Sequence, residues 1–193
     1  NTWVGALLAL CVSLAIGALN GILVSRTGID SFLITLAAFL MLQGLNLAVT
    51  KLVTGQVATP SISDMEGFES ARRFFAGSFH IGRVNINVTV VWWLFFVAVA
   101  SFVLFRTKFG NWVTAVGGDE DAARAVGVPV RKVKVALFMT VGFAAWFVGM
   151  HTLFAFDSIQ AGQGVGNEFL YIIAAVIGGC AMNGGRGTAV GTA

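Results

Sequence analysis

Five polar or aromatic side chains lie within long apolar runs of this sequence, where they could line a path for a polar solute. Gln43 and Asn46 are three residues apart and would share one face of a helix, as would His151 and Phe154, with Trp146 slightly earlier in the same run. Amide, imidazole and aromatic groups can pair with the hydroxyl groups of a solute, which cost free energy when buried unpaired. The alternative for each residue is a hydrogen bond between helices or ordinary packing.

The titratable residues form no catalytic or metal-binding pattern. No Asp or Glu lies within the apolar runs, and the two histidines, His80 and His151, are isolated in the sequence. Cys11 and Cys180 both sit in apolar runs and match no metal-ligand spacing. The phosphate-binding pattern G-x-x-x-x-G-K-[ST] does not occur. The sequence therefore predicts a chain with no catalytic, cofactor-binding or metal site of its own.

The composition is that of a membrane protein. Hydrophobic residues make up 57% of the chain and charged residues 11%, whereas about 25% are charged in a typical soluble domain. The net charge of +3 is the ordinary result of basic cytoplasmic loops and does not indicate a nucleic-acid partner. We expect the chain to lie in a lipid bilayer.

Charge-free stretches predict the membrane spans, because a charge at the centre of a bilayer costs about 2.5–3.5 kcal/mol. A span of roughly 30 Å requires about 20 helical residues. The first four stretches reach that length and the fifth predicts a short span or a re-entrant helix. The stretches are residues 1–25, 31–50, 84–105, 135–156 and 169–185.

The basic residues predict the orientation. Six of them fall within residues 106–134, which we therefore expect to form a cytoplasmic loop, together with the turn that holds Arg26. Alternation then places residues 55–83 and the 157–168 loop outside the cell. The chain also reads as one piece, residues 1–193, of the transmembrane domain of a longer polytopic protein.

Residues 119–129 predict a short capped helix in the cytoplasmic loop. Asp119 can cap its start, Glu120 suits the positive end of the helix dipole and Arg124 suits the negative end. Gly127 can adopt a left-handed conformation after the last turn, and Pro129 can open the next helix. A helix this short needs support from its own chain or a partner. It is therefore either a capped linker or a docking helix.

Three groups of residues resemble the permease subunit of ribose-type monosaccharide ABC importers. The first is the cytoplasmic loop, the second is a glycine-rich distal signature, and the third lies in the second span. They are residues 106–110 with 115–124 and 127–128; residues 173–179 with 184–188 and 191–192; and residues 32–36 with 43–45. The resemblance runs from about Leu19 to Ala193.

The resemblance implies an all-α polytopic fold, with about four full transmembrane helices plus a short fifth or re-entrant helix in a bundle of about ten spans. It implies that residues 119–127 form a coupling helix that docks on a cytosolic nucleotide-binding ATPase subunit, which binds the ATP. The other implied partners are a second permease copy and a periplasmic sugar-binding protein, at the bacterial inner membrane. The residues expected to couple to the ATPase subunit are Asp119, Glu120, Ala122, Ala123, Arg124 and Gly127.

The sequence departs from the family at two places. Asp119 stands where the family often has Asn, and residues 180–183 differ from the usual distal signature. Branched-chain amino acid and autoinducer permeases share much of the pattern, so the substrate stays open. The alternatives in other classes are a secondary, ion-coupled carrier, for which only His151 offers an ionisable group within a span, and a structural membrane scaffold.

The 55–83 segment is expected to form part of the outer surface on which the binding protein lands. It contains four phenylalanines, which allow the alternative that it lies on the bilayer as an interfacial helix. They are Phe68, Phe74, Phe75 and Phe79.

Overall fold

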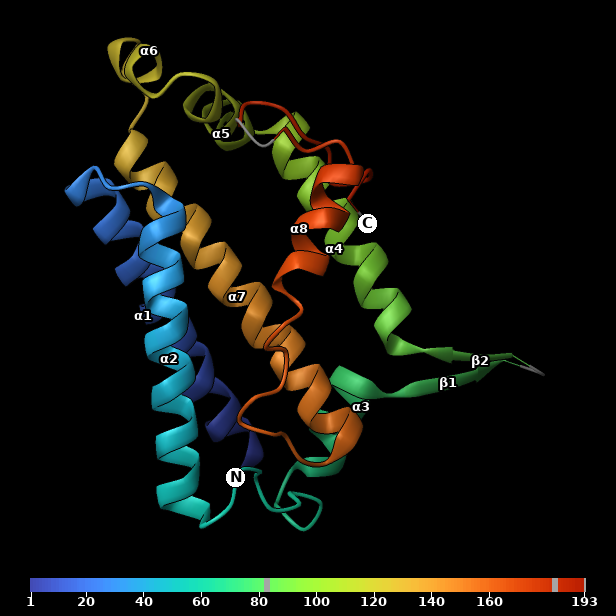
Figure 1. Ribbon diagram of the computed structural model, residues 1–193. Helices are drawn as coiled ribbons and strands as arrows, with labels where there is room; N and C mark the ends of the chain where they lie inside the picture. Colours follow the sequence, from blue (N-terminus) through green and yellow to red (C-terminus); the bar gives the residue numbers. More distant parts are fainter. Residues whose placement is uncertain (82–83, 182–183, 193) are drawn as a thin grey trace. The chain divides into compact units, whose positions relative to one another are not determined.

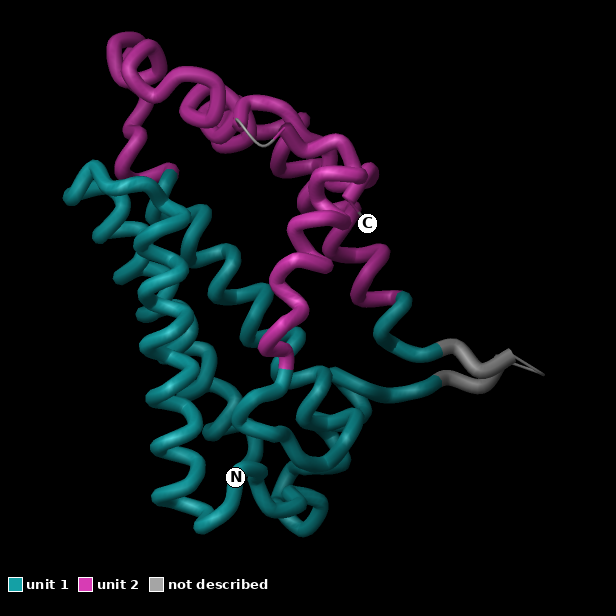
Figure 2. The backbone as a smooth tube through the Cα atoms, in the orientation of Figure 1, with its two compact units in different colours: residues 1–90, 134–163 teal, residues 91–133, 164–193 magenta. Residues whose placement is uncertain are grey.

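The computed structural model describes residues 1–81, 84–181 and 184–192 (Figure 1). Arg83, Met182 and Asn183, which belong to segments discussed above, lie outside these ranges. The chain divides into two compact units, one formed by residues 1–90 and 134–163 and the other by residues 91–133 and 164–193 (Figure 2). Each is described here by itself.

Within the described ranges the regular elements are helices, apart from one short antiparallel hairpin. Its strands pair Ser78 with Asn87 and Ile81 with Val84. The elements are α1 (Thr2–Thr27), α2 (Ser31–Thr54), α3 (Phe68–Ala76), β1 (Ser78–Ile81), β2 (Val84–Asn87), α4 (Val88–Arg106), α5 (Lys108–Gly118), α6 (Glu120–Ala125), α7 (Val130–Phe156) and α8 (Glu168–Ile177).

Four helices are long and apolar enough to cross a membrane: α1, α2, α4 and α7. They coincide with the four charge-free stretches predicted to be full spans, so the all-α, multi-pass fold is confirmed. Helix α8 has 10 residues and a length of about 15 Å, half the thickness of the hydrocarbon layer. It is therefore the short fifth helix that the sequence predicted.

Several helix limits differ from the charge-free stretches: α2 continues to Thr54, and α7 already begins at Val130. Two further differences arise from backbone hydrogen bonds. Residues 84–87 form strand β2, so the third span begins at Val88. Helix α8 ends at Ile177 because Gly179 has a φ of 88°, and its N–H and that of Cys180 donate to the carbonyls of Val176 and Ala175. This pair of hydrogen bonds is a Schellman motif, which ends a helix without a charged residue.

Small residues bring α1 and α7 together in the first unit. Ser13 Oγ donates a hydrogen bond of 2.7 Å to the carbonyl oxygen of Gly142, across the two helices. A Cβ on Gly17 would lie 2.6 Å from the carbonyl oxygen of Phe138, and one on Gly21 would lie 2.7 Å from Cα of Val135. Helices in lipid associate through such close backbone packing.

The segments that join the spans at one end of this unit are hydrogen-bonded to one another. Thr2 donates its N–H to the carbonyl of Glu66, and Ala161 donates to that of Val57. Thr59 exchanges hydrogen bonds with Ile159: its N–H donates to the carbonyl, and its hydroxyl accepts from the Ile159 N–H. The two loops predicted to share one side of the membrane, at residues 55–83 and 157–168, therefore meet in the structure.

A cluster of aromatic side chains forms the core of the same unit. Phe68, Ala71 and Phe75 lie on one face of α3 at helical spacing and are buried against Phe154 of α7. The rings of Phe75 and Phe154 are stacked, with centroids 5.5 Å apart. Helix α3 thus buries two of its phenylalanines in protein, while Phe74 is partly exposed.

The long helices keep apolar outer faces. Helix α2, all of whose residues are described, buries none of them, and its apolar side chains include Met41, Leu52 and Val53, each more than 70% exposed. An apolar surface of this extent suits lipid tails or neighbouring spans.

In the second unit, a chain of short elements follows α4. Thr107 ends the span and caps α5, its hydroxyl accepting a hydrogen bond from the Gly110 N–H at 3.2 Å. Asp119 separates α5 from α6, and α8 is followed by a loop of which residues 178–181 and 184–192 are described. Helix α6 thus lies between α5 and α7 along the chain.

Candidate functional site

The start of α6 is capped by Asp119. Its Oδ1 accepts hydrogen bonds of 2.9 Å from the backbone N–H groups of Asp121 and Ala122, two donors that the helix itself leaves unpaired. The N–H of Asp119 in turn donates to the carbonyl of Ala115, the last-turn pairing of α5. One residue therefore ends α5 and begins α6, as the sequence predicted for the cap.

The end of α6 is a Schellman motif. Gly127 has a φ of 84°, and its N–H donates to the carbonyl of Arg124 while the N–H of Val128 donates to that of Ala123. A side chain at position 127 would strain this conformation. The prediction that Gly127 closes the helix is confirmed.

Two ion pairs lie along the helix. Arg124 approaches Glu120 at 3.1 Å and Asp121 at 3.7 Å, with its side chain 64% exposed. Exposed pairs of this kind contribute about 0.3–0.5 kcal/mol each. The stability of α6 therefore depends mainly on its caps and on its contact with the rest of the unit.

The alanines of α6 do not share one environment. Ala123 is 3% exposed and lies against its own chain, so it holds the helix in place. Ala122 and Ala125 are exposed, and Val126 directly after the helix is 79% exposed. The exposed apolar residues of this segment are therefore Ala122, Ala125 and Val126, which lie beside the exposed charged side chains of Asp121 and Arg124.

Removing the cap should unwind the first turn. We expect Asp119→Ala to destabilise α6 by about 1 kcal/mol, because the N–H groups of Asp121 and Ala122 lose their acceptor. Faster hydrogen exchange at these two amides in the detergent-solubilised permease would report the loss. Asp119→Asn is the matched control, since its side-chain oxygen keeps the cap while the charge is removed. Equal exchange rates in all three proteins would contradict the assignment.

Three of the five candidate path residues are held by partners in the first unit. Trp146 Nε1 donates a hydrogen bond of 2.9 Å to the carbonyl of Ala6, which supplies the partner that its indole N–H requires. Phe154 is 1% exposed within the aromatic core. These residues hold α1 and α3 against α7.

His151 caps the end of α3. Its Nδ1 lies 2.8 Å from the carbonyl oxygen of Phe75, one of the last carbonyls of that helix, and must carry the proton because a carbonyl only accepts. Its Nε2 lies 3.5 Å from Thr89 Oγ1.

Gln43 and Asn46 occupy exposed positions on α2, apart from the aromatic core. Asn46 Nδ2 donates a hydrogen bond of 2.8 Å to the carbonyl of Ala161, so its oxygen stays available as an acceptor. The structure therefore groups Trp146, His151 and Phe154 around α3 and leaves Gln43 and Asn46 as a separate polar pair.

Sequence reasoning missed the organising residue of that core, Phe75. The rings of Phe74, Trp146, Phe147 and Phe154 all lie within 6 Å of its ring centroid. The signal was present, because Phe68, Ala71 and Phe75 recur at helical spacing while Arg73 falls on the opposite side.

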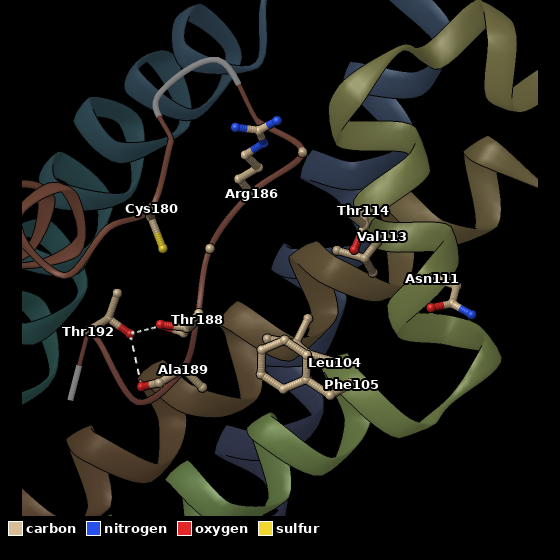
Figure 3. Close-up of a pocket in the computed structure, with 12 residues that line it drawn as sticks. Leu104, Phe105, Asn111, Val113, Thr114, Cys180, Arg186, Thr188, Ala189 and Thr192 are labelled. Atoms are coloured by element: carbon tan, nitrogen blue, oxygen red, sulfur yellow. Dashed lines mark hydrogen bonds between the residues drawn. The ribbon is translucent and has the colours of Figure 1, made fainter.

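The second unit contains a pocket of about 700 Å³ between α4, α5 and the loop after α8 (Figure 3). Leu104 and Phe105 form an apolar wall, and Asn111 and Thr114 of α5 add polar groups. Val113 of α5 also lines the pocket, and the loop contributes Cys180, Gly185, Arg186, Gly187, Thr188, Ala189 and Thr192.

The chain is similar to sugar permeases of bacteria. It is 33% identical over its whole length to the ribose import permease protein RbsC of Escherichia coli K12, covering 57% of that protein. It is 32% identical to the fructose import permease protein FruF of Bifidobacterium longum over 100% of this chain and 52% of that one. It is 31% identical to the L-arabinose ABC transporter permease protein AraH of Azospirillum brasilense, over 92% and 48%.

The chain thus spans about half the length of the curated relatives it matches. No solved structure gives a significant match. A family model described as the permease component of the branched-chain amino acid transport system matches residues 1–193. With four apolar helices of spanning length, the chain is a multi-pass inner-membrane protein. It belongs to the family of the branched-chain amino acid transport system permease component.

Proposed function

We propose that this chain is part of the permease subunit of an ATP-driven, binding-protein-dependent importer of a monosaccharide. Similarity over its whole length to permeases named for ribose and fructose import supports the substrate class. The single observation that carries the mechanism is α6, a doubly capped helix between two spans that exposes two alanines, Ala122 and Ala125, beside charged side chains.

In this proposal, residues 106–134 form a cytoplasmic loop and α6 is its coupling helix. A cytosolic ATPase subunit grips the face of Ala122, Ala125 and Val126, with Glu120 and Arg124 at its rim. Closure of two ATPase subunits on ATP would displace α6 and tilt the spans of two permease copies, so that the cavity between them opens inward.

The 55–83 segment would lie outside the cell, where a sugar-loaded binding protein docks. Its hydrogen bonds to the 157–163 loop make the outer ends of the first, second and fourth spans one connected surface. The polar pair Gln43 and Asn46 on α2 is our candidate for contact with the sugar. Trp146, His151 and Phe154 would support the outer end of the path through α3.

Reconstitution of the permease that carries this chain tests the proposal. Together with its ATPase subunit in liposomes, it should hydrolyse ATP faster when sugar-loaded binding protein is added, and sugar should accumulate only with ATP. Uptake that follows a proton gradient without ATP would instead identify a secondary carrier.

A further inference from the structure

Two glycine-containing segments of the second unit touch backbone to backbone. A Cβ on Gly117, next to the end of α5, would lie 2.6 Å from the backbone N of Gly185 and 3.2 Å from its Cα. A Cβ on Gly184 would collide with the carbonyl oxygen of Gly117. No side chain fits between the two segments. Their contact is therefore formed by backbone atoms, which cannot be moved aside as a side chain can by changing its rotamer.

The loop that carries Gly184 is itself tightly closed. Ala181 donates its N–H to the carbonyl of Arg186 at 2.9 Å, and Thr188 Oγ1 accepts from the N–H of Gly191 at 3.1 Å. Thr192 Oγ1 donates toward the carbonyls of Thr188 and Ala189, as the dashed lines in Figure 3 show. These hydrogen bonds link the described parts of the loop, residues 178–181 and 184–192, to one another.

The same loop is joined to the end of α8. A Cβ on Gly191 would collide with the carbonyl oxygen of Gly178, the residue directly after α8, and a Cβ on Gly178 would collide with the carbonyl of Gly191. The loop thus meets the end of α5, just before α6, through the backbone of Gly184 and Gly185. It meets Gly178, just after α8, through the backbone of Gly191 and Thr192.

We propose that Gly117 and Gly184 are positioning residues that tie the coupling helix to α8, so that a displacement of α6 moves the loop of residues 178–192 and α8 with it. This inference rests on the proposed function. It adds how a movement of α6 would be transmitted from the cytoplasmic loop to the rest of the permease. Gly117 lies two residues before the cap Asp119, so little backbone separates the contact from α6. Its consequence is that the transport step, rather than docking of the ATPase subunit, depends on this contact.

Gly117→Ala tests the contact, with Gly118→Ala as a matched control. Both glycines end α5, but a Cβ on Gly118 would meet no described atom within 4 Å. Neither has a positive φ, so neither alanine strains its own backbone. In the reconstituted complex we expect Gly117→Ala to lower sugar transported per ATP by roughly tenfold while the ATPase subunit stays bound, and Gly118→Ala to behave as wild type.

A distance measurement provides a readout that does not require transport. Spin labels at Ala115→Cys on α5 and Val190→Cys in the loop, with Cys11 and Cys180 replaced by serine, would report their separation in the assembled complex. Gly117→Ala should lengthen and broaden this distance, and Gly118→Ala should leave it unchanged.

The inference would be overturned if Gly117→Ala left both the spin-label distance and the sugar transported per ATP at their wild-type values. It would also be overturned if the spin-label distance changed and the sugar transported per ATP did not. If the binding protein did not raise the ATPase activity of the wild-type complex, this result would contradict the proposed function instead. The two failures are distinguished because the first is seen only in the variant and the second in the parent complex.

Discussion

Phe75→Ala should destabilise the first unit by about 3–5 kcal/mol, the usual cost of emptying a site filled by a buried phenylalanine. Phe75 is 1% exposed, and its ring contacts α7 through Trp146, Phe147 and Phe154. Without this ring, α3 loses its main contact with α7. The expected result is a marked fall in the midpoint of thermal or denaturant unfolding of the purified permease, followed by the fluorescence of Trp3 and Trp146.

Phe74→Ala is the matched control for this change. Phe74 is the neighbouring residue on α3 and is 44% exposed, with its ring packed edge-on against those of Phe75 and Trp3. We expect its loss to cost about 1 kcal/mol, in the range of one aromatic pair. Equal destabilisation by the two substitutions would contradict the assignment of Phe75 as the centre of the core.

Ala122→Trp should abolish binding of the ATPase subunit. Ala122 lies on the exposed face of α6, so an indole there can be accommodated by the fold but would hold a docked partner away from the helix. A bulky side chain at the centre of an interface keeps the two surfaces apart, so the surrounding contacts that exclude water cannot form. The expected result is loss of the ATPase subunit when the permease is affinity-purified, with normal membrane insertion.

Ala115→Trp is the control for Ala122→Trp, because Ala115 is an exposed alanine on the adjacent α5. We expect it to leave co-purification intact. Ala123→Trp would not serve, since Ala123 is 3% exposed and the larger side chain would displace α6 itself. Undiminished co-purification with Ala122→Trp would count against α6 as the docking element.

The four membrane spans were predictable from the positions of the charged residues. Charges are excluded from the hydrocarbon layer by several kcal/mol, so their absence over 20 residues marks a span whatever the neighbouring helices do. The caps of α6 were equally legible. Asp119 and Gly127 act on backbone groups within three or four residues of themselves, and such interactions depend on local sequence alone.

The limits of the fifth helix were less well predicted, because the absence of charges does not show where a helix ends. Gly178 and Gly179 terminate α8 at Ile177, although residues up to Gly185 are also uncharged. Residues 84–87 likewise look like the start of a span and instead pair as a strand with residues 78–81. Both differences come from backbone hydrogen bonds, which a count of charges does not register.

Sequence alone determined that this chain crosses a membrane, which segments cross it, and that a short capped helix, α6, lies between the third and fourth spans. The spans follow from transfer energies and the short helix from local capping. The tertiary structure alone decided which residues meet. It placed Phe75 against Phe154, turned Ala123 inward and Ala122 outward, and set Gly117 against Gly184. Phe75 and Phe154 are 79 positions apart. Contacts of this kind depend on how closely two backbones approach, a quantity that no local pattern contains.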